Sequence, residues 1–486
     1  NSNDNDKKEL RLKDDADQII ASLENLPWIV REIKKGTRTK RPSPPFTTST
    51  LQQEASKLLG FATGKTMMVA QQLYEGVDIQ GEGTLGLVSY IRTDSVRIAD
   101  EAHEEAKHFI IGRYGEEFAN LEKPQYKSKG RTQDAHEAVR PTYTAKTPEA
   151  MKASLTREQY RLYKLIWERF LASQMTPAIY DVLTVKISVG ETVFRAGGSQ
   201  LKFKGYLAVY NKNEQDPEEE FKMPELLVDQ QLTLLEFQPE QHFTQPPPRY
   251  SEASLVKTME ELGIGRPSTY ASTIGNIIQR HYVIKENKVF YMTDLGEIVN
   301  DIMRSNFENI VDIEFTAKME ESLDKVEEGG LEWKEIVRNF YAPFNEKILL
   351  AEEKIGEIDV EDEKTDVLCE NCGRNMVIKF GRFGKFLACP GFPECRNTKP
   401  FFEDAGVLCP VCGGRVLIKK TKKGRKFYGC EKGPECNFMT WDRPTGELCP
   451  ECGGYMVEKG RKNKRTVCSN SQCKFVKELE NETEQN

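Results

Sequence analysis

The cysteine pattern constrains this chain more than any other feature of the sequence. Three CxxC pairs recur every 40 residues, and each is answered by a second pair after 16, 17 and 15 intervening residues. Four thiolates at this spacing suit tetrahedral zinc, and the regular period indicates an array of similar small units. The three expected ligand sets are Cys369, Cys372, Cys389 and Cys395; Cys409, Cys412, Cys430 and Cys436; and Cys449, Cys452, Cys468 and Cys473.

Disulfides are the alternative use of these cysteines. Secreted disulfide-rich domains follow a signal peptide, and the polar residues Asn1–Glu9 do not resemble one. All 12 cysteines also fall within the paired sets. We therefore expect up to three structural Zn²⁺ ions. Units of about 30 residues bury too little apolar surface to fold alone, so the metal supplies much of their folding free energy.

Charge is distributed unevenly along the chain. The formal net charge is -7, yet residues 366–477 carry 22 Lys and Arg against 11 Asp and Glu. Phosphate binding depends on local positive patches, so a nucleic-acid partner is compatible with the acidic total. No apolar run approaches the roughly 18 residues that cross a bilayer, which favours a soluble protein.

Aromatic residues are interspersed with Lys and Arg in the cysteine array. This combination stacks on unpaired bases while following a phosphate backbone, although a miniature core would also use aromatic residues. The third unit has Thr466–Val467 where the others carry Phe386–Leu387 and Phe427–Tyr428. We expect single-stranded DNA binding from the first two units and another role for the third. The aromatic residues concerned are Phe380, Phe383, Phe386, Phe427, Tyr428 and Trp441.

The chain before the array changes character twice. Amphipathic patterns indicate helices over most of 47–176, short β-branched and aromatic runs indicate strands within 180–237, and helices return from 251 to 347. A hairpin at 282–293 follows a helix, which is the element order of a winged helix. We expect individual helices at 51–59, 67–74, 98–111 and 160–173, and strands at 180–189, 192–196, 205–210 and 231–237.

Residues 89–95 read Ser-Tyr-Ile-Arg-Thr-Asp-Ser. A short strand would place Val88, Tyr90 and Arg92 on one face, and Asp94 or Ser95 would cap the helix that follows. A phenol is a poor nucleophile unless a cation stabilises its oxyanion, a role open to Arg92. On spacing alone, a half-buried packing role for Tyr90 is the simpler interpretation.

Residues 89–95 resemble the nucleophile motif of bacterial type IA DNA topoisomerases. Four further blocks, at 45–52, 134–141, 174–177 and 263–270, resemble that family in its order, so the resemblance covers nearly the whole chain. It implies a multidomain, mainly α fold with a β-rich hinge domain, in which a toroidal core is followed by three zinc ribbons with four cysteine ligands each.

The resemblance also implies a reaction. In the family a tyrosine cleaves one strand of negatively supercoiled DNA and holds its 5′ phosphate, the other strand passes through an opened protein gate, and the break is resealed without ATP. Tyr90 would be that nucleophile, with Arg92 on the scissile phosphate and His136 near it. The residues implied to line the pocket or to contact DNA are Gln71, Glu75, Thr93, Asp94, Arg266, Ser268, Thr269 and Arg280.

Each of these assignments has a plain structural alternative. His136 suits a satisfied interior histidine, and Arg280 suits a solvated surface residue. Ser268 and Thr269 open a helix, where hydroxyls and free amides suit a phosphate, but a simple N-cap explains Ser268 equally well. Residues 60–66 imitate a P-loop with three residues between the glycines where four are needed, so we expect no ATP site there.

The same resemblance implies binding partners and a metal-binding domain that we do not find in this sequence. We expect a monomer that is cytoplasmic and nucleoid-associated, binds DNA and especially single-stranded segments, and contacts RNA polymerase through the zinc ribbons. Family members begin with a TOPRIM domain whose acidic cluster binds Mg²⁺. We find no such motif, so we expect the Mg²⁺ ligands to be absent from this chain and cleavage to be weak without them.

A non-enzymatic alternative remains open. In it, the chain is a zinc-ribbon protein that binds single-stranded DNA or docks on RNA polymerase, and Tyr90 only packs. The expected domains are a discontinuous β-rich gate hinge (1–48 plus 177–248), a helical nucleophile domain (49–176), a winged-helix-like domain (249–351), an acidic linker (352–366), three ribbons (367–403, 407–443 and 447–477) and a disordered tail (478–486).

Overall fold

The computed structural model describes residues 12–126, 136–210, 224–354, 363–381, 384–421, 426–459, 465–470 and 472–478. Several sequence expectations lie outside these residues: the polar start, Asp134, Phe383, the middle of the acidic linker, the tail after residue 478 and the side chain of Phe380. The chain divides into two compact units, Asn1–Lys354 and Ile355–Asn486, each of which we describe by itself.

Helices build the main core of the first unit, as the amphipathic patterns predicted. The longest of them, α6 (Arg157–Ser173), begins with a Thr156 capping box and runs through the core, where Leu162, Ile166 and Phe170 are almost fully buried. Around it lie α2 (Thr48–Glu54), which continues as a π turn (Ala55–Leu59), α3 (Thr63–Glu75), the β2–β3 hairpin (Val77–Ile79 and Gly83–Leu85), α4 (Asp100–Tyr114), a 3₁₀ turn (Glu116–Phe118) and α5 (Pro148–Met151).

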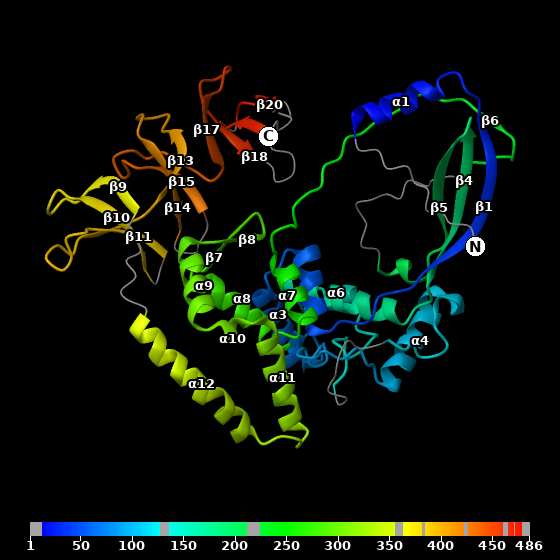
Figure 1. Ribbon diagram of the computed structural model, residues 1–486, viewed down its shortest axis with the longest axis horizontal. Helices are drawn as coiled ribbons and strands as arrows, with labels where there is room; N and C mark the ends of the chain where they lie inside the picture. Colours follow the sequence, from blue (N-terminus) through cyan, green and yellow to red (C-terminus); the bar gives the residue numbers. More distant parts are fainter. Residues whose placement is uncertain are drawn as a thin grey trace. The chain divides into compact units, whose positions relative to one another are not determined.

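An antiparallel sheet combines two distant parts of the chain. Its order is β5-β4-β1-β6, and β1 (Trp28–Lys40) pairs with β4 (Ala178–Val189) from Ile29↔Ser188 to Lys40↔Ala178. Figure 1 shows β1 in blue beside the green β4 and β5 (Thr192–Phe203), with α1 (Lys13–Leu23) near one end of the sheet. The β-rich part is therefore assembled from segments on both sides of the helical core.

One strand expectation in this region was wrong, and another was too long. Residues 205–210 form a 3₁₀ turn (Gly205–Ala208) followed by irregular chain, and β6 (Gln231–Leu232) has only two residues. Gly205 has a left-handed φ of 47°, and a Cβ there would overlap the carbonyl oxygen of Pro177. Tyr206 and Tyr210 are buried in the helical core. Packing of these two rings, which a short sequence window cannot reveal, overrides the β propensity of the segment.

The last part of the first unit has its own small core of Val256, Ile274 and Phe290. The expected helix and hairpin are confirmed, with Asn287 and Lys288 in the left-handed region at the turn. The elements are α7 (Glu252–Glu261), α8 (Tyr270–Gln279), β7 (Val283–Glu286), β8 (Val289–Met292), α9 (Asp294–Asn306), α10 (Glu308–Val311), α11 (Ile313–Glu327) and α12 (Trp333–Lys354).

The second unit contains three successive four-stranded antiparallel sheets, one for each cysteine set. They consist of β9 to β12 (Glu363–Leu368, Asn375–Gly381, Gly384–Ala388 and Thr398–Pro400), β13 to β16 (Glu403–Leu408, Arg415–Lys420, Lys426–Cys430 and Met439–Thr440) and β17 to β20 (Arg443–Leu448, Tyr455–Lys459, Arg465–Cys468 and Val476–Glu478). The predicted fold class, helical with β-rich parts and three four-cysteine ribbons, is confirmed. None of the helices in the described residues has the length and hydropathy needed to span a membrane.

Candidate active site and zinc sites

The segment that carries Tyr90 is an extended loop. The expected short strand and capped helix are both absent from this described segment: only Val88 forms a β-bridge, with Pro141, and α4 begins at Asp100 after Ala99. Backbone bonds such as Ser89 N–H to the Arg140 carbonyl at 2.9 Å hold this loop, and side chains satisfy further groups of its backbone. Thr48, which is fully buried, donates from Oγ1 to the Ile91 carbonyl at 2.7 Å and accepts from the Thr93 amide at 2.8 Å.

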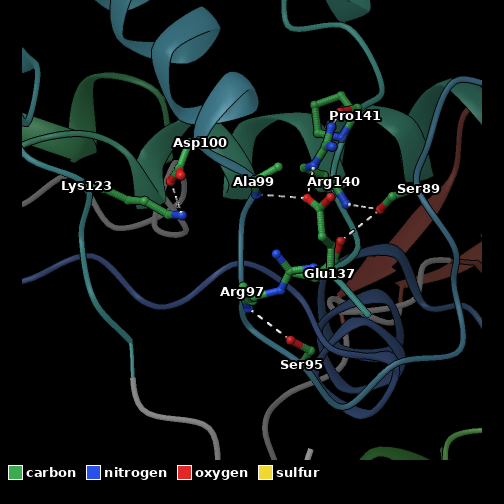
Figure 2. A network of polar contacts seen from close by, with 10 residues as sticks. Ser89, Ser95, Arg97, Ala99, Asp100, Lys123, Glu137, Arg140 and Pro141 are labelled. Carbon is green, nitrogen blue, oxygen red and sulfur yellow. Dashed lines mark hydrogen bonds and ion pairs between the residues drawn. The ribbon is translucent and has the colours of Figure 1, made fainter. Parts of the chain in front are cut away.

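A second set of polar contacts fixes the other edge of the loop, as Figure 2 shows. Ser89 Oγ donates to the Ala138 carbonyl at 2.8 Å and accepts from the Arg140 amide at 3.0 Å. Glu137 Oε2 accepts from Arg140 Nε at 2.8 Å and from the Ala99 amide at 3.0 Å. Burial raises the pKa of Glu137, but these two hydrogen bonds outweigh it and hold the pKa below its ordinary value. The carboxylate is therefore charged and ties the segment 136–141 to Ala99 at the start of α4.

Tyr90 itself remains accessible, with 41% of its surface exposed. Its ring centroid lies 5.4 Å from that of His136 and 5.6 Å from that of Tyr74, the latter in an edge-on contact. The next residue, Ile91, is buried and anchors the loop. The structure therefore brings Tyr90 and His136 together, as the sequence suggested.

Tyr74 contacts the Tyr90 ring but was not among the residues predicted from the sequence. It lies on α3 between Gln71 and Glu75, and Gln71 Nε2 donates to Glu75 Oε1 at 2.7 Å. Spacings of three and four residues place all three side chains on one helix face. That spacing could have identified Tyr74 as a neighbour of Gln71 and Glu75. However, an aromatic residue in an amphipathic helix is more often part of a hydrophobic core.

A cleft of about 910 Å³ lies beside this loop. Thr93 and Asp94 contribute to one wall, and residues of the α7–α8 loop and α11, among them Arg266 and Asp324, contribute to another. Burial raises the pKa of Asp94, while the charges of Arg266 and His136 oppose the rise. Thr93 is almost fully buried and its hydroxyl accepts from the Ser95 amide at 3.0 Å, so it supports the loop more than it presents a free hydroxyl.

Arg266, Ser268 and Thr269, which the sequence also predicted as site residues, lie just before the start of α8. Arg266 forms ion pairs with Asp324 at 2.8 Å and Glu320 at 3.7 Å, and its amide donates to Thr269 Oγ1 at 2.9 Å. The N-cap alternative for Ser268 is wrong, because α8 starts after Thr269 and has no side-chain cap.

Two of the predicted cations are open to solvent. Arg92 and Arg280 are both exposed, and no ion pair within the described part of the chain involves either. Arg280 is the C-cap of α8, and no described contact joins it to the Tyr90 group.

The twelve cysteines form three compact sets, one per ribbon. In each set the four Sγ atoms lie within 4.8 Å of one another, and the closest pairs are 3.2 to 3.8 Å apart. A tetrahedral Zn²⁺ with bonds of about 2.3 Å requires sulfur atoms about 3.8 Å apart. All twelve are free thiols, which does not support the disulfide alternative. The sets therefore provide three sites for structural zinc.

Each knuckle also has the same backbone geometry. A glycine with a left-handed φ of 70 to 72° follows the second cysteine of each CxxC pair (Gly373, Gly413 and Gly453), and its amide donates to the carbonyl of the first cysteine at 2.8 to 2.9 Å. Only glycine adopts this conformation without strain. The turn brings the paired thiols to the same four-cysteine set, so the 40-residue repeat of the sequence is a repeat of local geometry.

Strand register distinguishes the third ribbon from the first two. Lys379 pairs with Phe386, Lys419 with Phe427, and Lys459 with Arg465. The alignment expected from the sequence, with Thr466–Val467 at the aromatic positions, was therefore one residue out. Arg465–Thr466 is the equivalent pair, and Thr466 is the buried member. Two ribbons present a lysine beside a phenylalanine, and the third presents two cations.

Comparisons with known proteins agree with this geometry. A protein-family model described as DNA topoisomerase matches residues 1–338, and one described as topoisomerase DNA binding C4 zinc finger matches residues 366–403, 406–445 and 446–482. The chain is also similar to the solved structure of full-length topoisomerase I from Thermotoga maritima, with 36% identity and a TM-score of 0.62. That similarity covers 82% of this chain and 63% of the other, so this chain spans less than two thirds of its length.

Proposed function

Because the chain belongs to the bacterial type IA DNA topoisomerase family, we propose that it acts in the ATP-independent relaxation of negatively supercoiled DNA. The reaction would proceed by transient cleavage of one strand through a 5′-phosphotyrosine and passage of another strand through the break. The observation that carries this proposal is Tyr90: it is exposed, yet its loop is fixed by the buried hydrogen bond of Thr48 on one side and by the partly buried bond of Ser89 on the other.

The proposed chemistry uses the Tyr90 hydroxyl as the nucleophile. The phenol gives up its proton as its oxygen attacks the phosphorus, a phosphotyrosine ester forms, and the bond from phosphorus to the 3′ oxygen breaks; that oxygen takes up a proton and leaves as a 3′ hydroxyl. The ester retains the energy of the phosphodiester, so the reverse attack reseals the strand without a nucleotide cofactor. Arg92 would contact the scissile phosphate, and His136 lies against the Tyr90 ring where it can orient the phenol.

Further DNA contacts are assigned by motif. Thr269, Ser268 and Arg280 on or before α8 would bind the backbone of the strand, and Gln71 and Glu75 would line the pocket beside Tyr90. Arg266 already holds Asp324 and Glu320. A phosphate would therefore have to displace these carboxylates, which makes Arg266 a contact formed only with DNA present.

Magnesium belongs to the family reaction, where it neutralises charge on the scissile phosphate. Within the described residues, every group of three or more potential metal ligands is a cysteine set. Such thiolate sets suit zinc and not Mg²⁺, which takes oxygen ligands. We propose that the described residues bind DNA but cleave it weakly until a TOPRIM segment supplies oxygen ligands for Mg²⁺.

The ribbons are proposed to hold single-stranded DNA. In the first two, the lysine–phenylalanine pairs put a stacking surface next to a cation, and in the second Phe427 also contacts Trp441 edge-on at 6.0 Å. The third ribbon has Arg465 instead, so it is the one we would test for a protein partner such as RNA polymerase. The family resemblance supports four further proposals. The protein closes into a torus, and its gate opens by motion about the β1–β4–β5 sheet. The protein is a monomer and is cytoplasmic.

Covalent capture tests the function directly. A labelled single-stranded oligonucleotide is incubated with the chain, alone and with a TOPRIM-bearing fragment plus Mg²⁺, and resolved on a denaturing gel. We expect capture in the mixture, its loss in Tyr90→Phe, and its retention in Tyr341→Phe, an exposed tyrosine on α12. If a folded mixture captures no DNA, the non-enzymatic zinc-ribbon protein becomes the better account.

A further inference from the structure

Helix α3 has no N-cap side chain of its own. It begins at Thr63 after Ala62, and Ala62 makes no side-chain cap bond. Glu252 supplies the cap from a distant part of the chain: its Oε2 accepts from the Thr63 amide at 2.6 Å and from Thr63 Oγ1 at 3.0 Å. Glu252 is only 4% exposed, so this is a buried contact between segments 189 residues apart.

The same carboxylate serves two more elements. Glu252 is the first residue of α7, so its negative charge lies at the N-termini of both α7 and α3, where helix dipoles favour an anion. Its Oε1 is paired with Lys285 on β7. Burial raises the pKa of Glu252, but the bonds from Lys285 and Thr63 outweigh it and hold the pKa below its ordinary value. The group is therefore charged while the three elements are together.

The other end of α3 reaches the nucleophile. The helix has 13 residues and is thus about 20 Å long, and its last turns carry Tyr74 against the Tyr90 ring, with Gln71 and Glu75 on the same face. Since a helix transmits displacement as a nearly rigid rod, fixing α3 at Thr63 also fixes where Tyr74 meets Tyr90.

We propose that Glu252 is a positioning residue that couples closure of the protein to assembly of the nucleophile site. While residues 249–351 lie against the helical core, Glu252 holds α3, and α3 holds Tyr90 through Tyr74. When the two parts separate for strand passage, Thr63 and Lys285 lose their shared carboxylate and α3 loses its cap. This inference rests on the proposed function, because it assigns a role in that reaction.

The test compares Glu252→Gln with Glu158→Gln. Glu158 also pairs with α3, through Lys65, but that ion pair is exposed and contributes little. In hydrogen exchange on the full chain, we expect the amides of Thr63–Thr66 to exchange at least about tenfold faster in Glu252→Gln, because a charged hydrogen bond is weakened. Glu158→Gln should leave them unchanged. Thr63→Val, which removes only the hydroxyl contact, should give a smaller change in the same direction.

Covalent capture in the TOPRIM-supplemented mixture supplies the second readout. Glu252→Gln should slow capture about tenfold at saturating oligonucleotide while the concentration for half-maximal binding stays the same. Unchanged exchange at Thr63–Thr66 would overturn the inference. So would faster exchange throughout the first unit with a normal capture rate, since that pattern describes a purely structural residue. If the wild type captures nothing, the proposed function fails and the positioning role with it, whereas normal wild-type capture with an unaffected variant removes only the role of Glu252.

Discussion

The ribbons and the nucleophile region reach their structures by opposite routes. In each ribbon, four ligands within about 30 residues determine the fold. In the described part of the third, the buried cluster consists of Cys449, Met456 and Cys468. The Tyr90 loop is instead held by residues 40 to 50 positions away in the sequence, such as Thr48 and Ala138. It packs on one large hydrophobic core. One region depends on metal and local spacing, and the other depends on long-range packing.

Removal of the metal should produce the largest difference in stability between the two regions. Structural zinc contributes about 10 to 16 kcal/mol per site in small zinc domains, so a strong chelator should unfold the ribbons. The first unit buries its own core and should keep its helices. Trp441 is the one tryptophan in the cysteine array, while Trp28, Trp167 and Trp333 precede it, so fluorescence of single-tryptophan variants reports each region. Helix loss on chelation would show that the two units are not independent.

The substitution Phe170→Ala should destabilise the first unit and leave the ribbons intact. Phe170 is 1% exposed in α6, and removing such a ring from a core costs about 3 to 5 kcal/mol. We expect the thermal unfolding of the first unit to shift down strongly while zinc content, measured after gel filtration, stays at the wild-type level. The matched control is Leu121→Ala, a 62% exposed position that should change stability little. Zinc loss in Phe170→Ala would contradict the comparison.

The same contrast explains what the sequence could predict. Cysteine spacing sets the zinc ligands locally, and the hairpin predicted at 282–293 is likewise a local feature, formed by a tight turn at Asn287–Lys288. Both were therefore foreseen. The pairing of β1 with β4 joins residues about 150 apart, and no local pattern gives its register. Tyr74 was overlooked for a related reason: its contact with Tyr90 depends on how α3 and the loop pack, which helical periodicity does not reveal.

The Tyr90 loop offers a finer test of long-range support. Thr48→Val keeps the side-chain volume but removes the hydroxyl that serves Ile91 and Thr93, leaving buried backbone groups unpaired. Such a loss costs about 1 to 3 kcal/mol. We expect reduced stability of the first unit and slower Tyr90 capture. Thr84→Val removes an exposed hydrogen bond to Asp78 and should do neither. Equal effects of the two variants would show that Thr48 does not support the loop.

The smallest predicted effect is a gain in stability, whereas the substitutions above reduce stability. Burial raises the pKa of Asp94 above its ordinary 3.8, so folding disfavours the charged carboxylate. The folded state therefore binds the proton more tightly than the unfolded state, and stability falls as pH rises from below 3.8 through the folded pKa. Asp94→Asn removes that penalty and should raise the free energy of unfolding at pH 7 by less than about 1 kcal/mol, because the half-exposed group is screened by water. The gain should vanish near pH 3, where the carboxyl is protonated in both states. A destabilised variant at pH 7 would instead mean that the attraction of Arg266 and His136 for the Asp94 charge outweighs its burial, and this wall of the cleft would then be held together by charge, as the ribbons are held by metal.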